Sequence, residues 1–192
     1  MTHLGRETAG TKTKRSKMVR FPRNGKSPKK SKLAQKDTDA DWTKKNGERH
    51  FGYKDHVKCD ADSKLITNYS VTSASVHDSQ RCLVFIGQED EVLYADSAYS
   101  GKPIALALPE NCKNQICEKG YRNSPLTSEQ KMNNRRKSRI RCRIEHIFVF
   151  MTGAMHGITI RSIGITRAWM NIGITNLVYN FCRYSYLKRA SA

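Results

Sequence analysis

Two carboxylates in this sequence have neighbours that suit chemistry on a phosphate backbone. Asp96 ends an apolar run, residues 91–95, and is followed at once by small residues, an aromatic and a glycine. Glu145 stands four positions after Arg141 in a strongly basic segment. Phosphodiester cleavage uses hard oxygen ligands for Mg²⁺ or Mn²⁺, and two such metals can activate the attacking oxygen and stabilise the leaving one. The two acids together predict a metal site on a strand-and-helix scaffold.

Each carboxylate also has a purely structural interpretation. Asp96 can cap the following helix or close a turn through its own backbone. Glu145 can form an ordinary surface ion pair with Arg141, which lies one helical turn away. These alternatives stay open for either residue alone, and only the joint occurrence of the two acids in a basic chain favours chemistry.

The charge of the chain indicates a polyanionic partner. The 192 residues include 35 Lys and Arg against 17 Asp and Glu, which gives a formal net charge of +18. Residues 1–36 contain 12 of these cations and one acid, and residues 119–143 contain nine cations and one acid. A basic arm and a basic helix on a nearly neutral body suit DNA, although charge runs are often only solvated faces. Arg135, Arg139, Arg141 and Arg143 are candidate DNA contacts in the second segment.

Other classes of protein fit the sequence poorly. The longest apolar candidate for a membrane span, residues 168–182, has 15 residues where about 20 are needed. The first residues lack the apolar segment of a signal peptide, so we expect a cytoplasmic, nucleoid-associated protein. The six cysteines contain no C-x-x-C pair, which favours buried reduced thiols over a zinc site.

The order of predicted elements indicates a mixed α/β domain. Residues 1–36 are predicted to be a disordered arm because their apolar content is too low to bury. We expect a β-hairpin from 50–58 and 65–72, a helix opened by Asp78 or Ser79, a strand at 91–95, a short helix within 100–112 and a strand within 114–121. Thr127 and Gln130 have capping-box spacing and open a helix predicted to run to Met151. Residues 157–188 predict one or two helices, which ends the domain 37–188 and leaves a tail, 189–192.

Five stretches of the sequence resemble a known family. They are QKDTDADWTKKNGERHFGYKDHV, VTSASVHDSQ, YADSAYSG, ICEKGYRNSPLTSEQKMNNRRKSRIRCRIEHIF and IGITNLVYNFCRY, in that order from residue 35 to 184. These stretches are similar to the catalytic half of bacterial insertion-sequence DDE transposases. The resemblance implies a ribonuclease-H-like mixed sheet flanked by helices, in which three carboxylates hold two divalent metals for DNA strand cleavage and transfer.

The resemblance also assigns residues by motif position. Asp96 is similar to the second acid of the family and Glu145 to the third, with Arg141 keeping an R-x-x-x-E spacing. His77 and His146 stand at motif positions and are interpreted as DNA contacts or supporting residues, and His56 as a strand-face residue. DNA is the implied partner, and a homo-oligomer on transposon ends is an expectation of the same resemblance.

The sequence departs from the family at its first catalytic Asp, for which we find no counterpart. Glu7 is the only acid before Asp37, so we expect an N-terminally truncated remnant with an incomplete first strand and no activity. Asp37, Asp39 and Asp41 could in principle replace the missing ligand, but the resemblance places them in a loop. A non-catalytic basic nucleic-acid-binding protein is the alternative function. It has no reason to keep Asp96 and Glu145 close in space.

Overall fold

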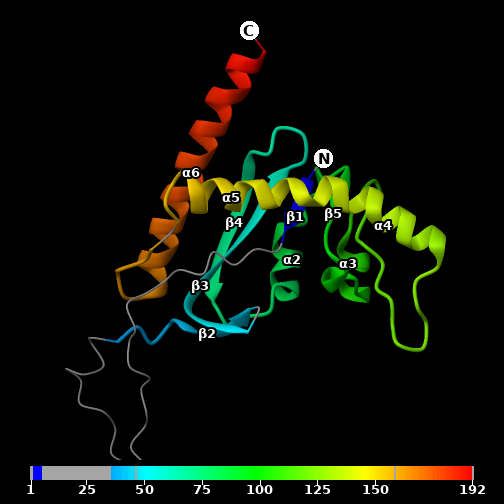
Figure 1. Cartoon of the computed structure of the whole chain (residues 1–192), viewed down its shortest axis with the longest axis horizontal. Helices are drawn as coiled ribbons and strands as arrows, with labels where there is room; N and C mark the ends of the chain where they lie inside the picture. The colour runs from blue at the N-terminus through cyan, green and yellow to red at the C-terminus, as the bar shows by residue number, and fades with distance from the viewer. Residues whose placement is uncertain (1, 6–35, 46, 158, 192) are drawn as a thin grey trace, which may run out of the picture.

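A mixed β-sheet lies at the centre of the computed structural model, which describes residues 2–5, 36–45, 47–157 and 159–191 (Figure 1). Its longest strand, β3 (Glu48–Asp60), forms an antiparallel hairpin with β4 (Ile66–Ser73). Asp60 closes the turn, because its Oδ1 accepts hydrogen bonds from the backbone nitrogen and hydroxyl of Ser63. The predicted hairpin is confirmed. The first half of β3 extends beyond it and pairs with β2 (Asp41–Lys45).

The strand β1 (Thr2–Gly5) corrects two predictions about the start of the chain. β1 lies between β3 and β5 (Val92–Tyr94), antiparallel to the first and parallel to the second. Residues 2–5 are therefore strand rather than part of a disordered arm, and the central position of the sheet is filled rather than incomplete. The remainder of the predicted arm, residues 6–35, lies outside the described residues. Composition misled here because a four-residue strand is formed by pairing with distant partners.

Two short helices cover one face of the sheet. α2 (Ser79–Phe85) and α3 (Lys102–Ala107) enclose a core cluster with Leu93 and Ala95, the alternate residues that β5 turns toward them. The strand predicted within 114–121 was wrong except at Asn114, because the strand that forms is β6 (Lys113–Asn114), which runs parallel to β5. The order of elements thus confirms a mixed sheet with helices on both faces.

The other face of the sheet is crossed by α4 (Ser128–Arg141) and α5 (Glu145–Gly153), which follow one another in nearly one line (Figure 1). The capping box is confirmed, because the Thr127 hydroxyl accepts from the Gln130 nitrogen while the Gln130 side chain accepts from the Thr127 nitrogen. The prediction of one continuous helix was wrong, because a 3-10 turn (Cys142–Ile144) separates the two parts. The apolar side chains Ile144, Ile147, Phe148 and Met151 are buried against Val57 and Cys59 of β3.

A single long helix, α6 (Ile165–Ala190), closes the fold over β3 and β4. It begins where the Ile165 nitrogen donates to Asp39 Oδ2 at 2.9 Å. Residues 189–190 belong to the helix and not to a separate tail. Within the described residues, no helix is long and apolar enough to cross a membrane.

The cysteines are free thiols in the structure. Cys59, Cys82, Cys112 and Cys117 are buried, which confirms the predicted burial for four of the six, whereas Cys182 is exposed. Burial raises the pKa of the Cys59 and Cys82 thiols to about 12, so both stay protonated at neutral pH.

Candidate functional site

Asp96 lies two residues after the end of β5 and remains in an extended conformation. Its Oδ1 accepts a hydrogen bond of 2.6 Å from the Ser97 nitrogen, so the side chain caps the 3-10 helix Ser97–Tyr99. The capping interpretation is therefore confirmed. Capping uses one of the two carboxylate oxygens of Asp96. The residue stands near the carboxyl end of a strand, where a ligand-binding residue of an open α/β sheet is expected.

Glu145 is the first residue of α5 and lies directly after the 3-10 turn. Its Oε1 lies 3.2 Å from Arg141 Nη2, and the Glu145 side chain is 43% exposed. The expected ion pair is thus present, but water screens it, and such pairs contribute a few tenths of a kcal/mol.

The alternation of side chains along β5 places Asp96 on the face of the sheet that α4 crosses. Leu93 and Ala95 point toward α2 and α3. Tyr94 points the opposite way and lines a cavity with Arg136 and Ile140 of α4. Asp96 comes two residues after Tyr94 on extended backbone, so it shares the side of Tyr94.

The contacts of α4 show which edge of the helix meets the carboxyl ends of the strands. Asn134 exchanges hydrogen bonds of 2.9 Å with the backbone of Glu118, and Ser138 Oγ lies 3.8 Å from Cys117 Sγ. The Cys117 nitrogen in turn donates to the Ala95 carbonyl, one residue before Asp96. Glu145 lies seven positions after Ser138, beyond the 3-10 turn that separates α4 from α5. Asp96 therefore follows a strand beside which α4 lies, and Glu145 begins the helix that comes after α4.

A complete metal site is not formed by the described residues. Among them, no three His, Cys, Asp or Glu side chains lie close enough together to hold a metal ion. Asp37 accepts from the Tyr53 hydroxyl at 2.7 Å, and Asp39 accepts from the first residue of α6. Asp41 accepts from the next backbone nitrogen in β2. These three acids have structural partners elsewhere in the fold and do not complete the pair Asp96 and Glu145.

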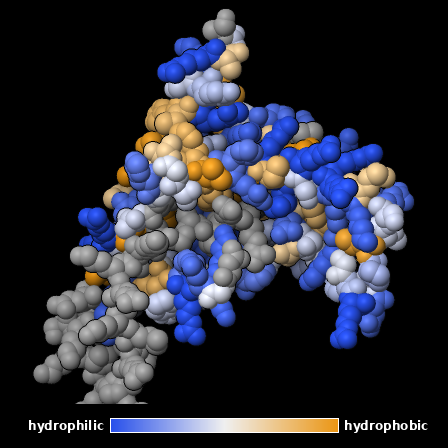
Figure 2. Space-filling model, in the orientation of Figure 1, coloured by the Kyte–Doolittle hydropathy of each residue, from blue (hydrophilic) through white to orange (hydrophobic). Residues whose placement is uncertain are grey.

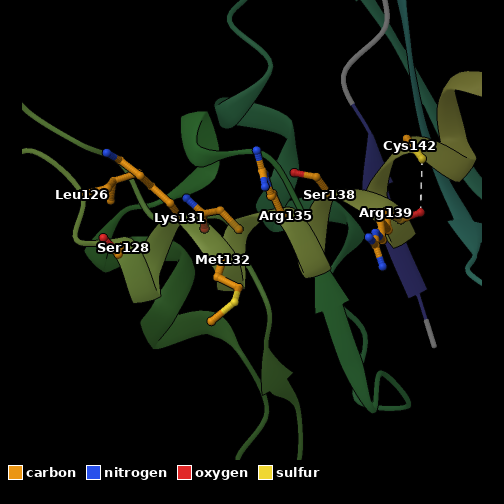
Figure 3. Close-up of a pocket in the computed structure, with 9 residues that line it drawn as sticks. Leu126, Ser128, Lys131, Met132, Arg135, Ser138, Arg139 and Cys142 are labelled. Carbon is orange, nitrogen blue, oxygen red and sulfur yellow. Dashed lines mark hydrogen bonds between the residues drawn. The ribbon is translucent and has the colours of Figure 1, made fainter.

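A wide groove runs along α4 (Figure 3). It has a volume of about 1040 Å³ and is lined by residues that recur at helical spacing: Leu126, Ser128, Lys131, Met132, Asn134, Arg135, Ser138, Arg139 and Cys142. Lys131, Arg135 and Arg139 occupy successive turns and give the groove its positive charge. The groove shares Asn134 and Ser138 with the edge described above, so it leads along the helix toward Glu145. We call these lining residues the α4 groove.

The other predicted DNA contacts are not brought together. Arg143 donates to the Ala61 carbonyl at 2.7 Å and pairs with Asp62 at 3.2 Å, so it holds the β3–β4 turn instead of lining the α4 groove. His77 is exposed beside α2, where its Nδ1 lies 2.8 Å from Ser79 Oγ. His146 is exposed on α5, across the sheet from α2. The two histidines thus occupy opposite faces.

One set of charged residues was not anticipated from the sequence. Lys54, His56 and Lys58 alternate along β3 and face α2, where Asp78 lies 3.3 Å from Lys54 and Asp90 lies 2.7 Å from Lys58. Burial lowers the pKa of His56 to about 4, so its ring is neutral at physiological pH. The alternation of these side chains along β3 is visible in the sequence. It does not identify their acidic partners, which come from other elements. Two aromatic residues are packing residues, with Trp42 against Phe51 and Tyr99 in the core.

Comparisons with known proteins show the family of this chain. Residues 16–181 match a family described as a transposase DDE domain. Over 124 residues, 63% of the chain, it is 32% identical to the transposase for insertion sequence element IS1106 from Neisseria meningitidis serogroup B, and the match covers 41% of that protein. The chain therefore spans less than half the length of this relative. No solved structure matches the chain. Because the family match covers most of the sequence, the chain belongs to the DDE transposases of insertion sequences.

Proposed function

We propose that this chain binds DNA as a ribonuclease-H-like transposase domain. The observation that carries the proposal is the basic α4 groove, which runs along a helix that contacts Cys117, the residue whose nitrogen donates to the Ala95 carbonyl just before Asp96. The strand arrangement supports the same fold, because β4, β3 and β1 form an antiparallel half of the sheet and β1, β5 and β6 a parallel half. The alternative of an unrelated basic binder gives no reason for the match to a transposase DDE domain.

Asp96 and Glu145 are proposed as two of the ligands for Mg²⁺ or Mn²⁺. Both are oxygen donors of the kind these cations prefer. The described residues do not supply the third carboxylate that a two-metal site of this class would use, and the loop acids Asp37, Asp39 and Asp41 have other partners. Two carboxylates carry too little negative charge to hold two divalent cations close together. The 192 residues by themselves are therefore proposed to bind DNA without cutting it.

DNA binding is proposed to depend on the cations of the α4 groove and not on the acids. Lys131 and Arg135 lie on one side of an exposed helix, where a phosphate backbone can follow them. Each phosphate contact releases counterions, so the affinity should fall steeply with salt and depend little on sequence. Contacts of this kind position a nucleic acid without reading its bases.

The test combines a cleavage assay with a binding assay. The chain is incubated with supercoiled plasmid and Mn²⁺ beside a double variant, Asp96→Asn with Glu145→Gln, and binding to a labelled duplex is measured by fluorescence anisotropy. We expect both proteins to bind the duplex and neither to nick the plasmid. Nicking by the parent chain but not by the double variant would show that another residue completes the site, and would refute the proposed inactivity. Absence of binding by the parent chain would refute the function.

A further inference from the structure

The face of α6 that points away from the sheet carries a row of exposed apolar side chains. Met170, Ile174, Leu177, Phe181 and Tyr184 are each 53 to 63% exposed. Their spacing is 4, 3, 4 and 3 residues, which is the heptad repeat of helix-to-helix seams. We call these five residues the α6 seam.

The α6 seam is separate from the face that α6 uses inside this fold. The residues of α6 that are buried against the sheet are Ala168, Ile172, Asn176 and Tyr179. At about 100° per residue, these four lie on the side of the helix opposite the seam. The core therefore does not need the seam side chains. Figure 2 shows apolar side chains gathered over α6, whereas the part of the surface around α4 is mostly hydrophilic.

The charge around the α6 seam excludes DNA as its occupant. The chain carries +18, yet from Ala168 to Leu187 the only charged residue is Arg183. Its Nε donates to the Ser63 carbonyl at 2.7 Å, on the side of the helix that faces the sheet. An apolar surface without cations offers a phosphate backbone nothing to bind. Two copies of the chain can approach each other there without the repulsion that their net charge causes elsewhere.

From these observations we propose that the α6 seam is the interface of a two-fold dimer, in which the α6 helices of two copies pack antiparallel with Leu177 at the two-fold axis. Leu177 is the middle residue of the seam, because Met170 and Tyr184 lie seven residues before and after it, with Ile174 and Phe181 between. A two-fold contact uses the same patch on both copies, so an apolar row centred on the axis packs against its own copy. A parallel arrangement would bring the Lys188 side chains of both copies together, because Lys188 continues the heptad repeat.

The area of the seam is adequate for a specific contact. Its five side chains expose roughly 600 Å² on each copy, given their exposed fractions and the ordinary size of such side chains. Burial of both copies removes about 1,200 Å² from water, which is above the roughly 1,000 Å² that a specific interface needs. The sheet lies on the side of α6 that is opposite the seam (Figure 1). In the dimer, the two α6 helices therefore stand between the two sheets.

The first experiment measures the oligomeric state of the whole chain by sedimentation equilibrium after nuclease treatment, in about 1 M NaCl to suppress bridging by nucleic acid. We expect a concentration-dependent dimer, and at least tenfold weaker association for Leu177→Glu. The matched control is Leu106→Glu on α3, which introduces the same charge at another exposed leucine and should leave the dimer intact. A chain that is monomeric in high salt while folded by circular dichroism overturns the proposal, as does equal weakening by both variants.

The second experiment tests the geometry without relying on a destabilising change. In a background with Cys142→Ser and Cys182→Ser, single variants Leu177→Cys and Tyr184→Cys are oxidised and examined on a non-reducing gel. We expect a covalent dimer from Leu177→Cys and almost none from Tyr184→Cys, because antiparallel packing holds the two copies of position 184 far apart. Cross-linking at both positions would overturn the antiparallel arrangement, and cross-linking at neither would overturn the seam. Both results are independent of DNA binding.

Discussion

Asn176 of α6 donates a hydrogen bond of 3.4 Å to Asp55 in the middle of β3, deep between the helix and the sheet. Both residues are buried, and Asp55 Oδ2 has no hydrogen-bond partner among the described residues. Burial raises the pKa of Asp55 to about 7, while the hydrogen bond from Asn176 partly offsets this rise. The chain therefore contains a carboxyl group that favours its protonated form in the folded state.

Stability should consequently fall as the pH rises toward neutrality. The unfolded chain releases the Asp55 proton near pH 4 and the folded chain near pH 7, so the free energy of unfolding decreases between these values. The decrease is on the order of 4 kcal/mol. Asp55→Asn removes this group from titration, and its free energy of unfolding should change less between pH 5 and pH 8. Urea unfolding followed by circular dichroism at both pH values measures the difference. Parallel pH profiles for parent and variant would contradict this assignment.

The buried pair Lys58 and Asp90 should show strong coupling. Lys58 Nζ lies 2.7 Å and 2.8 Å from the two Asp90 oxygens and also donates to the Phe85 carbonyl. Lys58→Met leaves the Asp90 charge without this cation and should cost about 3–5 kcal/mol of unfolding free energy.

A double-mutant cycle isolates the charge effect of this pair. Asp90→Asn keeps an acceptor for the Gly87 nitrogen, which donates to Asp90 at 2.9 Å. Lys58→Met with Asp90→Asn should therefore be more stable than Lys58→Met alone, by at least about 1 kcal/mol. Additive effects of the two substitutions would argue against coupling.

The cations of the α4 groove should set the salt dependence of DNA binding. Replacing Lys131, Arg135 and Arg139 together by Gln should weaken binding, because these side chains supply the positive charge of the groove. The slope of log affinity against log salt should become shallower by about 0.9 for each phosphate that the variant no longer neutralises. Fluorescence anisotropy titrations at several NaCl concentrations measure this slope.

The control for the groove substitutions removes the same number of positive charges from another part of the protein surface. Lys44, Lys45 and Arg49 are exposed on the hairpin of β2 and β3, and their joint replacement by Gln should leave most of the salt slope in place. Equal effects of the two triple variants would mean that net charge, and not the groove, controls binding.

The ion pair of Arg141 and Glu145 should contribute little to stability. Both side chains are partly exposed, so Arg141→Gln should change the free energy of unfolding by less than about 0.5 kcal/mol. Arg143→Gln is the matched comparison, because it removes the hydrogen bond to the Ala61 carbonyl and should cost about 1 kcal/mol. Thermal unfolding ranks the two variants, and the opposite order would refute this interpretation.

Features governed by neighbouring residues were predictable from the sequence. The capping box of Thr127 and Gln130, the turn closed by Asp60 and the buried stripe from Ile144 to Met151 all depend on spacing along a single element. The two carboxylates were identified in the same way, because Asp96 ends an apolar run and Glu145 follows a basic segment. The resemblance to DDE transposases rests on such local motifs and is confirmed by the family match.

Features that depend on pairing between distant segments were decided by the tertiary structure. The strand β1 forms because β3 and β5 provide hydrogen bonds on both sides of four residues in a basic segment. Arg143 looked like a DNA contact until the fold brought the β3–β4 turn within hydrogen-bonding distance. Asp55 meets Asn176 across 121 positions, and no local pattern specifies such a contact. Sequence periodicity determines which face of an element is apolar, whereas strand order and helix crossing determine which polar groups meet.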